Sequence, residues 1–262
     1  QQYNKIANFQ SFEGFARGSI MDVKLVFLIL TFSISVLGML AFVIALIQKQ
    51  VLVPHHAAEA IFGQGEIGKS ELDAKSELSN QWQKLDQSAK NPILFAIVVS
   101  VLWLVLGSIF GLLVSFKFHA PDFLGTQALL TFGKLRPLHL NIIAYGWLSP
   151  AALAIAMWLV PRLTKVPLQN TKILFAAGFI WNIGVIFGCV GILFGYSDGL
   201  EWLEFWWPFK ILLALAGAMV AIPLFRTVYL SKEKHLYVTL WYFIGALIWF
   251  PVLFIIANSH FL

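Results

Sequence analysis

Charge is scarce in this sequence. Of its 262 residues, 12% are Asp, Glu, Lys or Arg, whereas 59% are hydrophobic. An average soluble domain carries about twice that share of charge, so a water-soluble fold could not bury this many apolar residues. There is a single cysteine, Cys189, which excludes a disulfide framework within the chain. The net charge of +5 comes without a basic stripe of interleaved aromatic residues, which argues against nucleic-acid binding. These scarcities indicate an integral membrane protein.

Long apolar runs are abundant instead. A helix needs about 20 apolar residues to cross the hydrocarbon of a bilayer. Because lipid cannot satisfy open backbone groups, each span is expected to be helical. We predict an all-α polytopic membrane helix bundle with six transmembrane helices. The expected spans are residues 25–47, 92–116, 138–160, 173–196, 211–230 and 236–257.

One long polar segment, residues 49–91, separates the first two spans. Its stretch GKSELDAKSELSNQWQKLDQSAKN is charged, mixed in sign and rich in helix formers. We predict a solvated or interfacial helix there rather than a separate domain. The chain is accordingly divided into residues 1–91, an extra N-terminal transmembrane helix with a polar charged segment, and residues 92–262, a bundle of five helices.

Lysine and arginine are distributed unevenly between the two ends of the expected bundle. Of the 18, 11 fall on the loops after the first, third and fifth spans, and 7 on the opposite side. The richer side is therefore predicted to be cytoplasmic. The stretch GKLRPLHLN, residues 133–141, lies on the outer side, where the cations of Lys134 and Arg136 run against this rule. Topology does not explain these cations, which favours a local role.

A histidine follows these cations at the same membrane boundary. Pro137 suits the first turn of a helix, which would place His139 in the first turn of the third span. Helical spacing puts Ile143, Gly146 and Pro150 on the face of His139. Gly146 would leave room for a flat, bulky group beside the histidine.

Haem is a group of that kind. Imidazole is a common axial ligand of haem iron, so His139 is a candidate ligand. Lys134 and Arg136 would pair with the two propionates, for which the guanidinium offers bidentate geometry. The alternative is an interfacial histidine beside basic side chains that reach lipid headgroups. The residues alone leave both interpretations open.

A second polar stretch, SDGLEWLEFWWPFK, joins the fourth and fifth spans on the same outer side. Glu201 and Glu204 are three residues apart, so one helical turn would direct both to one side. Their carboxylates would pair with Arg136 or share a calcium ion with haem propionates. The alternative is an acidic outer loop with an aromatic belt of tryptophans.

These stretches resemble a known family. FHAPDFLGTQALLTFGKLRPLHLNIIAYGWLSPAALAIAMWLVPRLTK resembles the start of the catalytic subunit I of C-family (cbb3-type) haem–copper cytochrome c oxidases. The family pattern is close to G-R-L-R-P-L-H-x-N, and Lys134 stands at its first Arg. The loop GLEWLEFWWP is similar to the family's G-K-E-Y-A-E-L-E-W-P, and HLYVTLWYFIGALIWFPVLFIIAN resembles its fifth helix. The resemblance covers about residues 92–258.

The resemblance implies a role for each candidate residue. His139 would be one axial ligand of a low-spin haem b near the periplasmic surface, and Arg136 would contact its propionates. Glu201 would take part in a calcium site beside them, with Glu204 as its neighbour. The implied location is a bacterial inner (cytoplasmic) membrane, with the haem motif facing the periplasm.

The family's remaining ligands find no matching motif in the sequence. Residues 92–262 would form the N-terminal half of subunit I, and the chain would not be catalytic alone. We expect a high-spin haem and copper in a complementary part, either a second oxidase polypeptide or the rest of a longer chain. We expect c-type cytochrome subunits and the lipid bilayer as further partners. Two alternatives stay open. One is half of a nitric oxide reductase, a family whose loop reads more like E-Y-x-E-F-P. The other is a non-enzymatic membrane scaffold or transporter fragment.

Overall fold

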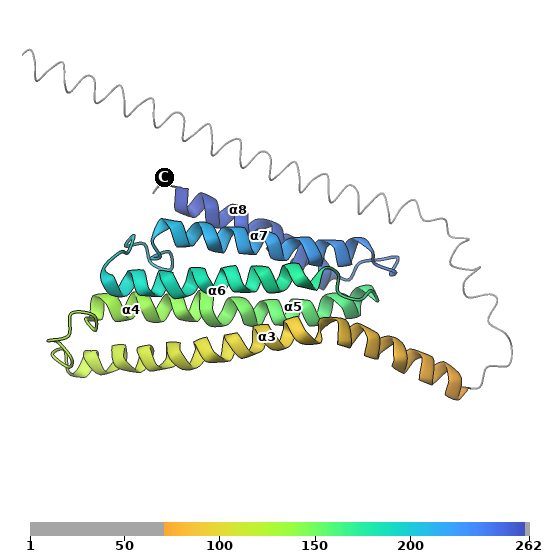
Figure 1. Ribbon diagram of the computed structural model, residues 1–262, viewed down its shortest axis with the longest axis horizontal. Coiled ribbons are helices and arrows are strands. Elements are labelled where there is room, and N and C mark those ends of the chain that lie inside the picture. Colours follow the sequence, from red (N-terminus) through yellow and green to blue (C-terminus); the bar gives the residue numbers. More distant parts are fainter. Residues whose placement is uncertain (1–70, 260–262) are drawn as a thin grey trace, which may run out of the picture.

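The computed structural model describes residues 71–259. Six α-helices and one π-helix form this part of the chain, and their order follows the sequence (Figure 1). They are α3 (Glu71–His119), α4 (Phe132–Asn141), η1 (Ile142–Leu148), α5 (Ser149–Thr164), α6 (Thr171–Phe194), α7 (Trp207–Tyr229) and α8 (Val238–Asn258). The first predicted span, residues 25–47, lies outside the described residues.

Five helical stretches of this part are long and apolar enough to cross a membrane. Each overlaps one of the five spans predicted after residue 91, which confirms the all-α membrane bundle. The stretches are Ser79–His119, Phe132–Thr164, Thr171–Phe194, Trp207–Tyr229 and Val238–Asn258.

The five stretches lie side by side and alternate in direction (Figure 1). The loops 120–131 and 195–206 meet at one end of the bundle, which we call the outer end. The loops 165–170 and 230–237 lie at the opposite, inner end. The two polar stretches singled out in the sequence are therefore at the same end, as alternation predicted.

α3 is longer than the span predicted within it. The polar residues 71–91 are helical and continue directly into the apolar run. Pro92 lies inside the helix, and α3 bends where it leaves the bundle (Figure 1), as proline commonly causes. Both carboxylate oxygens of Asp86 accept hydrogen bonds from Arg162 of α5, at 3.0 and 2.7 Å. Residues 71–91 of the predicted polar segment are thus helical and fixed to the inner end, whereas residues 49–70 lie outside the described residues.

The third span begins earlier than predicted. α4 starts at Phe132, so Pro137 lies in its second turn and His139 in its third, not in the first. The physical reason is that Thr131, rather than Pro137, ends the extended loop. Its backbone is extended, and its carbonyl accepts the first hydrogen bonds of the helix.

The π-helix Ile142–Leu148 was not predicted. Pro150 follows it closely, has no N–H to donate to the preceding turn, and crowds the carbonyl four residues back. Such a position favours a wider turn. The carbonyl of Tyr145 accepts a hydrogen bond from the indole N–H of Trp181 at 2.8 Å, so this turn is also satisfied from α6.

Phe205 fixes the loop 195–206 on the bundle. Its ring is 1% exposed and packs over Gly188 of α6. A Cβ atom added to Gly188 would lie 2.6 Å from Cδ1 of that ring. This glycine therefore sets how closely the outer loop approaches α6.

We expect Gly188→Ala to destabilise the protein by about 1–3 kcal/mol, because the added methyl group would overlap the buried ring of Phe205. Gly245→Ala in α8 is the matched control, since nothing lies within 4 Å of its added Cβ. Thermal unfolding of the purified membrane complex measures both. A Gly188→Ala variant as stable as the wild type would contradict this packing.

Candidate functional site

His139 lies against two glycines of α3. Its Nδ1 atom is 2.8 Å from the carbonyl oxygen of Gly107. A carbonyl only accepts hydrogen bonds, so Nδ1 is the donor, and in the neutral imidazole Nε2 then keeps its lone pair. A Cβ atom on Gly111 would lie 2.7 Å from Cε1 of the ring. The backbone of α3 thus fixes the imidazole in a tautomer that suits a metal ligand.

Ile143 and Gly146, which were predicted to share the face of His139, both pack against α3 as His139 does. Ile143 packs against Gly107, where an added Cβ would lie 2.9 Å from its Cδ1. At Gly146 an added Cβ would lie 2.7 Å from Cγ of Trp103. The indole of Trp103 occupies the space beside Gly146 that was predicted to admit a flat group. The observed role of Gly146 is close helix packing, and its contact with a cofactor stays a prediction.

Arg136 pairs with Glu201, one of the two pairings predicted for the loop carboxylates. The side chains are 47% and 54% exposed, so the pair contributes little stability by itself. Lys134 is half-buried, and within residues 71–259 no carboxylate pairs with it. The two cations therefore differ, because one is engaged by the loop and the other is available to an added anion.

Glu204 is buried, with 4% exposure. Its Oε2 accepts a hydrogen bond of 2.5 Å from Nδ2 of Asn141, which also donates to the carbonyl of Pro137 at 2.8 Å. Burial raises the pKa of the Glu204 carboxyl above its usual value, and the hydrogen bond from Asn141 opposes that shift. The charge of Glu201 adds to the rise. Glu204 is thus a carboxyl whose ionised form is disfavoured.

The two glutamates do not share a helical turn. Trp202 has a φ of 70°, which ends any helical turn directly after Glu201. The hydroxyl of Tyr145 donates a hydrogen bond of 2.6 Å to the carbonyl of Trp202 and holds the turn. As a result Glu201 lies at the surface, whereas Glu204 lies in the interior.

Comparison with known proteins identifies the family. Residues 91–262 match the family model described as "Cytochrome C and Quinol oxidase polypeptide I". The chain belongs to this family. It is 24% identical to the "Cbb3-type cytochrome c oxidase subunit CcoN1" of Stutzerimonas stutzeri over 161 residues. This matched region covers 62% of this chain and 34% of that protein.

Two further relatives are also subunit 1 proteins of cytochrome c oxidases or their homologues. The "Cytochrome c oxidase subunit 1" of Rhodobacter capsulatus is 26% identical over 165 residues, or 62% of this chain and 31% of that protein. A "Cytochrome c oxidase subunit 1 homolog" of Azorhizobium caulinodans is 24% identical over 196 residues, or 74% of this chain and 35% of that protein. The chain spans about a third of the length of these relatives. The predicted family resemblance is confirmed.

The family implies haems and copper, and the described residues fit part of that requirement. His139 offers one imidazole with a free Nε2. Within residues 71–259, no three His, Cys, Asp or Glu side chains gather closely enough to hold a metal ion. Calcium takes six to eight oxygens, so Glu201 and Glu204 would supply only part of its shell. The described site of this oxidase-family chain thus combines one imidazole, two cations and two carboxylates at the outer end.

Several residues of the site were missed by sequence reasoning. Asn141 and Tyr145 link the third span to the loop, and Gly107 and Gly111 receive the histidine. Two signals were available. Asn141 ends the same short stretch as His139, and the two glycines are four residues apart in LGSIFGLL, one turn of a helix.

The raised pKa of Glu204 predicts a pH effect. A folded pKa above the unfolded value means that this contribution to stability is complete below pH 4.5 and is lost as pH rises through the folded pKa. Glu204→Gln removes this titration, so its melting temperature should rise relative to the wild type as pH increases from 4.5 towards neutrality. Thermal unfolding of the purified complex across this range measures the difference.

Asp122→Asn, on the other outer loop, is the control because it removes an exposed carboxyl. It should keep the wild-type dependence on pH. Identical pH dependence of Glu204→Gln and the wild type would show that the burial of Glu204 does not shift its pKa.

Proposed function

We propose that this chain is a membrane subunit of a terminal respiratory cbb3-type cytochrome c oxidase, and that it supplies one axial ligand to a low-spin haem b. The observation that carries the proposal is the 2.8 Å contact from Nδ1 of His139 to the carbonyl of Gly107. It lies within a stretch that matches the oxidase family. When bound, the haem would pass single electrons from a c-type cytochrome towards an oxygen-reducing centre.

The chain's own residues would orient and charge-balance that haem. The hydrogen bond to the backbone of α3 fixes the orientation and the tautomer of the imidazole, so Nε2 is the nitrogen that would bind the iron. Lys134 and Arg136 would contact the propionates, and the pairing of Arg136 with Glu201 already restricts the guanidinium. Gly146 is proposed as a packing contact of the haem, which would require the indole of Trp103 to leave the space beside this glycine.

A calcium ion is proposed in addition to the haem. Glu201 is exposed enough to exchange its partner Arg136 for a cation. Glu204 would be a neighbour of the ion rather than a charged ligand, because it lies in the interior and burial disfavours its ionised form. The remaining oxygens would come from haem propionates, backbone carbonyls or water, since hard cations accept all of these.

The remaining parts of the oxidase are proposed as partners. A high-spin haem and copper would form the oxygen-reducing centre in another chain or in a further part of this polypeptide. The outer end would face the periplasm, because Lys and Arg are fewer on that side. A bacterial inner membrane fits the relatives in three bacteria and the five apolar helical stretches.

We expect His139→Ala to abolish the low-spin haem b signal in the reduced-minus-oxidised optical spectrum of the purified complex. The reason is the loss of an axial ligand, and the haem content from the same preparation measures retention independently. His119→Ala at the exposed end of α3 is the matched control and should keep the signal. An unchanged spectrum in His139→Ala would refute the proposal. Metal analysis of the complex should also find copper.

The charges beside the haem should tune its midpoint potential in opposite directions. Arg136→Gln removes a positive charge that favours the reduced form, so we expect the haem b potential to fall by tens of millivolts. Glu201→Gln removes a negative charge of the same pair and should raise it. Spectroelectrochemical titration of haem b measures both. Shifts of equal sign in both variants would contradict placement of this pair at the haem.

A further inference from the structure

A groove of about 810 Å³ runs along α3 at the inner end of the bundle. Gln83, Gln87 and Lys90 line its polar part, and Ile93, Leu94 and Trp158 line its apolar part. The change from polar to apolar falls at the start of the hydrophobic run of α3. The groove therefore spans the boundary between water and hydrocarbon.

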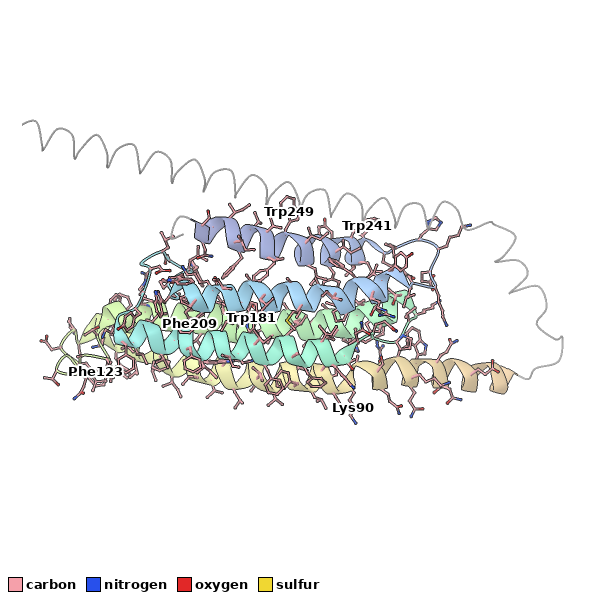
Figure 2. The ribbon with its side chains drawn as sticks, turned by 45° about the horizontal axis from the view of Figure 1, so that its top comes forward. Lys90, Phe123, Trp181, Phe209, Trp241 and Trp249 are labelled. Carbon is pink, nitrogen blue, oxygen red and sulfur yellow. The ribbon has the colours of Figure 1, made fainter. Side chains whose placement is uncertain are left out.

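The polar part of the groove carries net positive charge. Asp86 also lines it, but both of its carboxylate oxygens bind Arg162, at 3.0 and 2.7 Å. That pair is neutral. Lys90 is exposed, and within residues 71–259 no carboxylate pairs with it. Figure 2 shows Lys90 extending from α3 away from the bundle. The ammonium is thus available to an anion at this boundary.

Aromatic side chains hold the wall of the groove in place. The guanidinium of Arg162 lies 4.8 Å from the ring centroid of Trp158 and 5.7 Å from that of Trp82. Contacts of this type stabilise both partners. Trp158 is 47% exposed, and indoles prefer the headgroup level of a bilayer. The wall is therefore fixed at the depth where lipid headgroups lie.

The apolar part continues as a stripe along α3. Leu94, Ile97 and Val101 recur at helical spacing and are 49%, 44% and 50% exposed. Gln83, Gln87 and Lys90 precede them on the same face. One helical face thus presents a cation and amide donors first, then a path of apolar side chains. A free anion would use only the first part, whereas an amphipathic ligand would use both.

We propose that this groove binds one anionic phospholipid, with its phosphate at Lys90 and the amides of Gln83 and Gln87, and an acyl chain along Leu94, Ile97 and Val101. The site lies at the opposite end from His139 and is independent of haem. Charge complementarity and the length of the apolar stripe select a lipid over a soluble phosphate.

Native mass spectrometry of the purified membrane complex tests this proposal, after exchange into detergent with equal amounts of phosphatidylglycerol and phosphatidylcholine. We expect one retained phosphatidylglycerol in preference to phosphatidylcholine. A basic side chain near an anionic headgroup accounts for about a fivefold change in affinity, so Lys90→Gln should reduce the preference about fivefold. Lys84→Gln is the matched control, because it removes the same charge from an exposed position on another face of α3.

The outcomes separate the lipid from other sources of anion. Retention in the wild type and Lys84→Gln, with loss in Lys90→Gln, supports the site. No preference in the wild type, or equal retention in all three proteins, overturns it. Excess inorganic phosphate is added in a second arm. Displacement of the phosphatidylglycerol by inorganic phosphate would show a soluble-anion site and would also overturn the proposal.

Discussion

The buried hydrogen bond between Asn141 and Glu204 determines the arrangement of the outer end. It joins the helix that carries His139 to the loop between α6 and α7. Loss of a partner for a buried polar group costs about 1–3 kcal/mol, and more for a charged one, so the loop cannot shift along α4 without penalty. Arg136 and Glu201 form a weak exposed pair, and this buried contact keeps them in register.

The opposite side of the same helix is fixed by the backbone of α3. Gly107 accepts the hydrogen bond of the imidazole, and Gly111 leaves room for its ring. Further along, Trp103 fills the space above Gly146 and so sets how closely α3 and the π-helix approach each other. Because a backbone carbonyl holds the imidazole of His139, the orientation of the ring depends on the position of α3 and not on another side chain. The orientation of His139 is thus a consequence of how closely two helices approach.

Much of the fold followed from the sequence because apolar runs of this length have few alternatives in lipid. Alternation of the spans then placed Arg136 and Glu201 at one end, which was sufficient to predict their pairing. Glu204 points away from Glu201 because Trp202 between them has a positive φ. The spacing of the two glutamates in the sequence does not reveal this backbone conformation. The π-helix likewise depends on Pro150 acting on the preceding turn, which a periodic pattern does not record.

Buried polar groups are distributed unevenly between the two ends of the bundle. Among residues 71–259, the side chains with charged or amide groups and less than a tenth exposure gather at the outer end. They are Lys117, Asn141, Glu204, Lys210 and Asn258. At the inner end the buried polar residues are Thr164 and Thr227, whose hydroxyls bond to carbonyls of their own helices. Ordinary interfacial residues reach water or headgroups, whereas burying charge is costly. The outer end meets this cost with partners from the protein itself, since Lys117 donates to the carbonyl of Phe123, Lys210 pairs with Asp198 and Asn141 donates to Glu204.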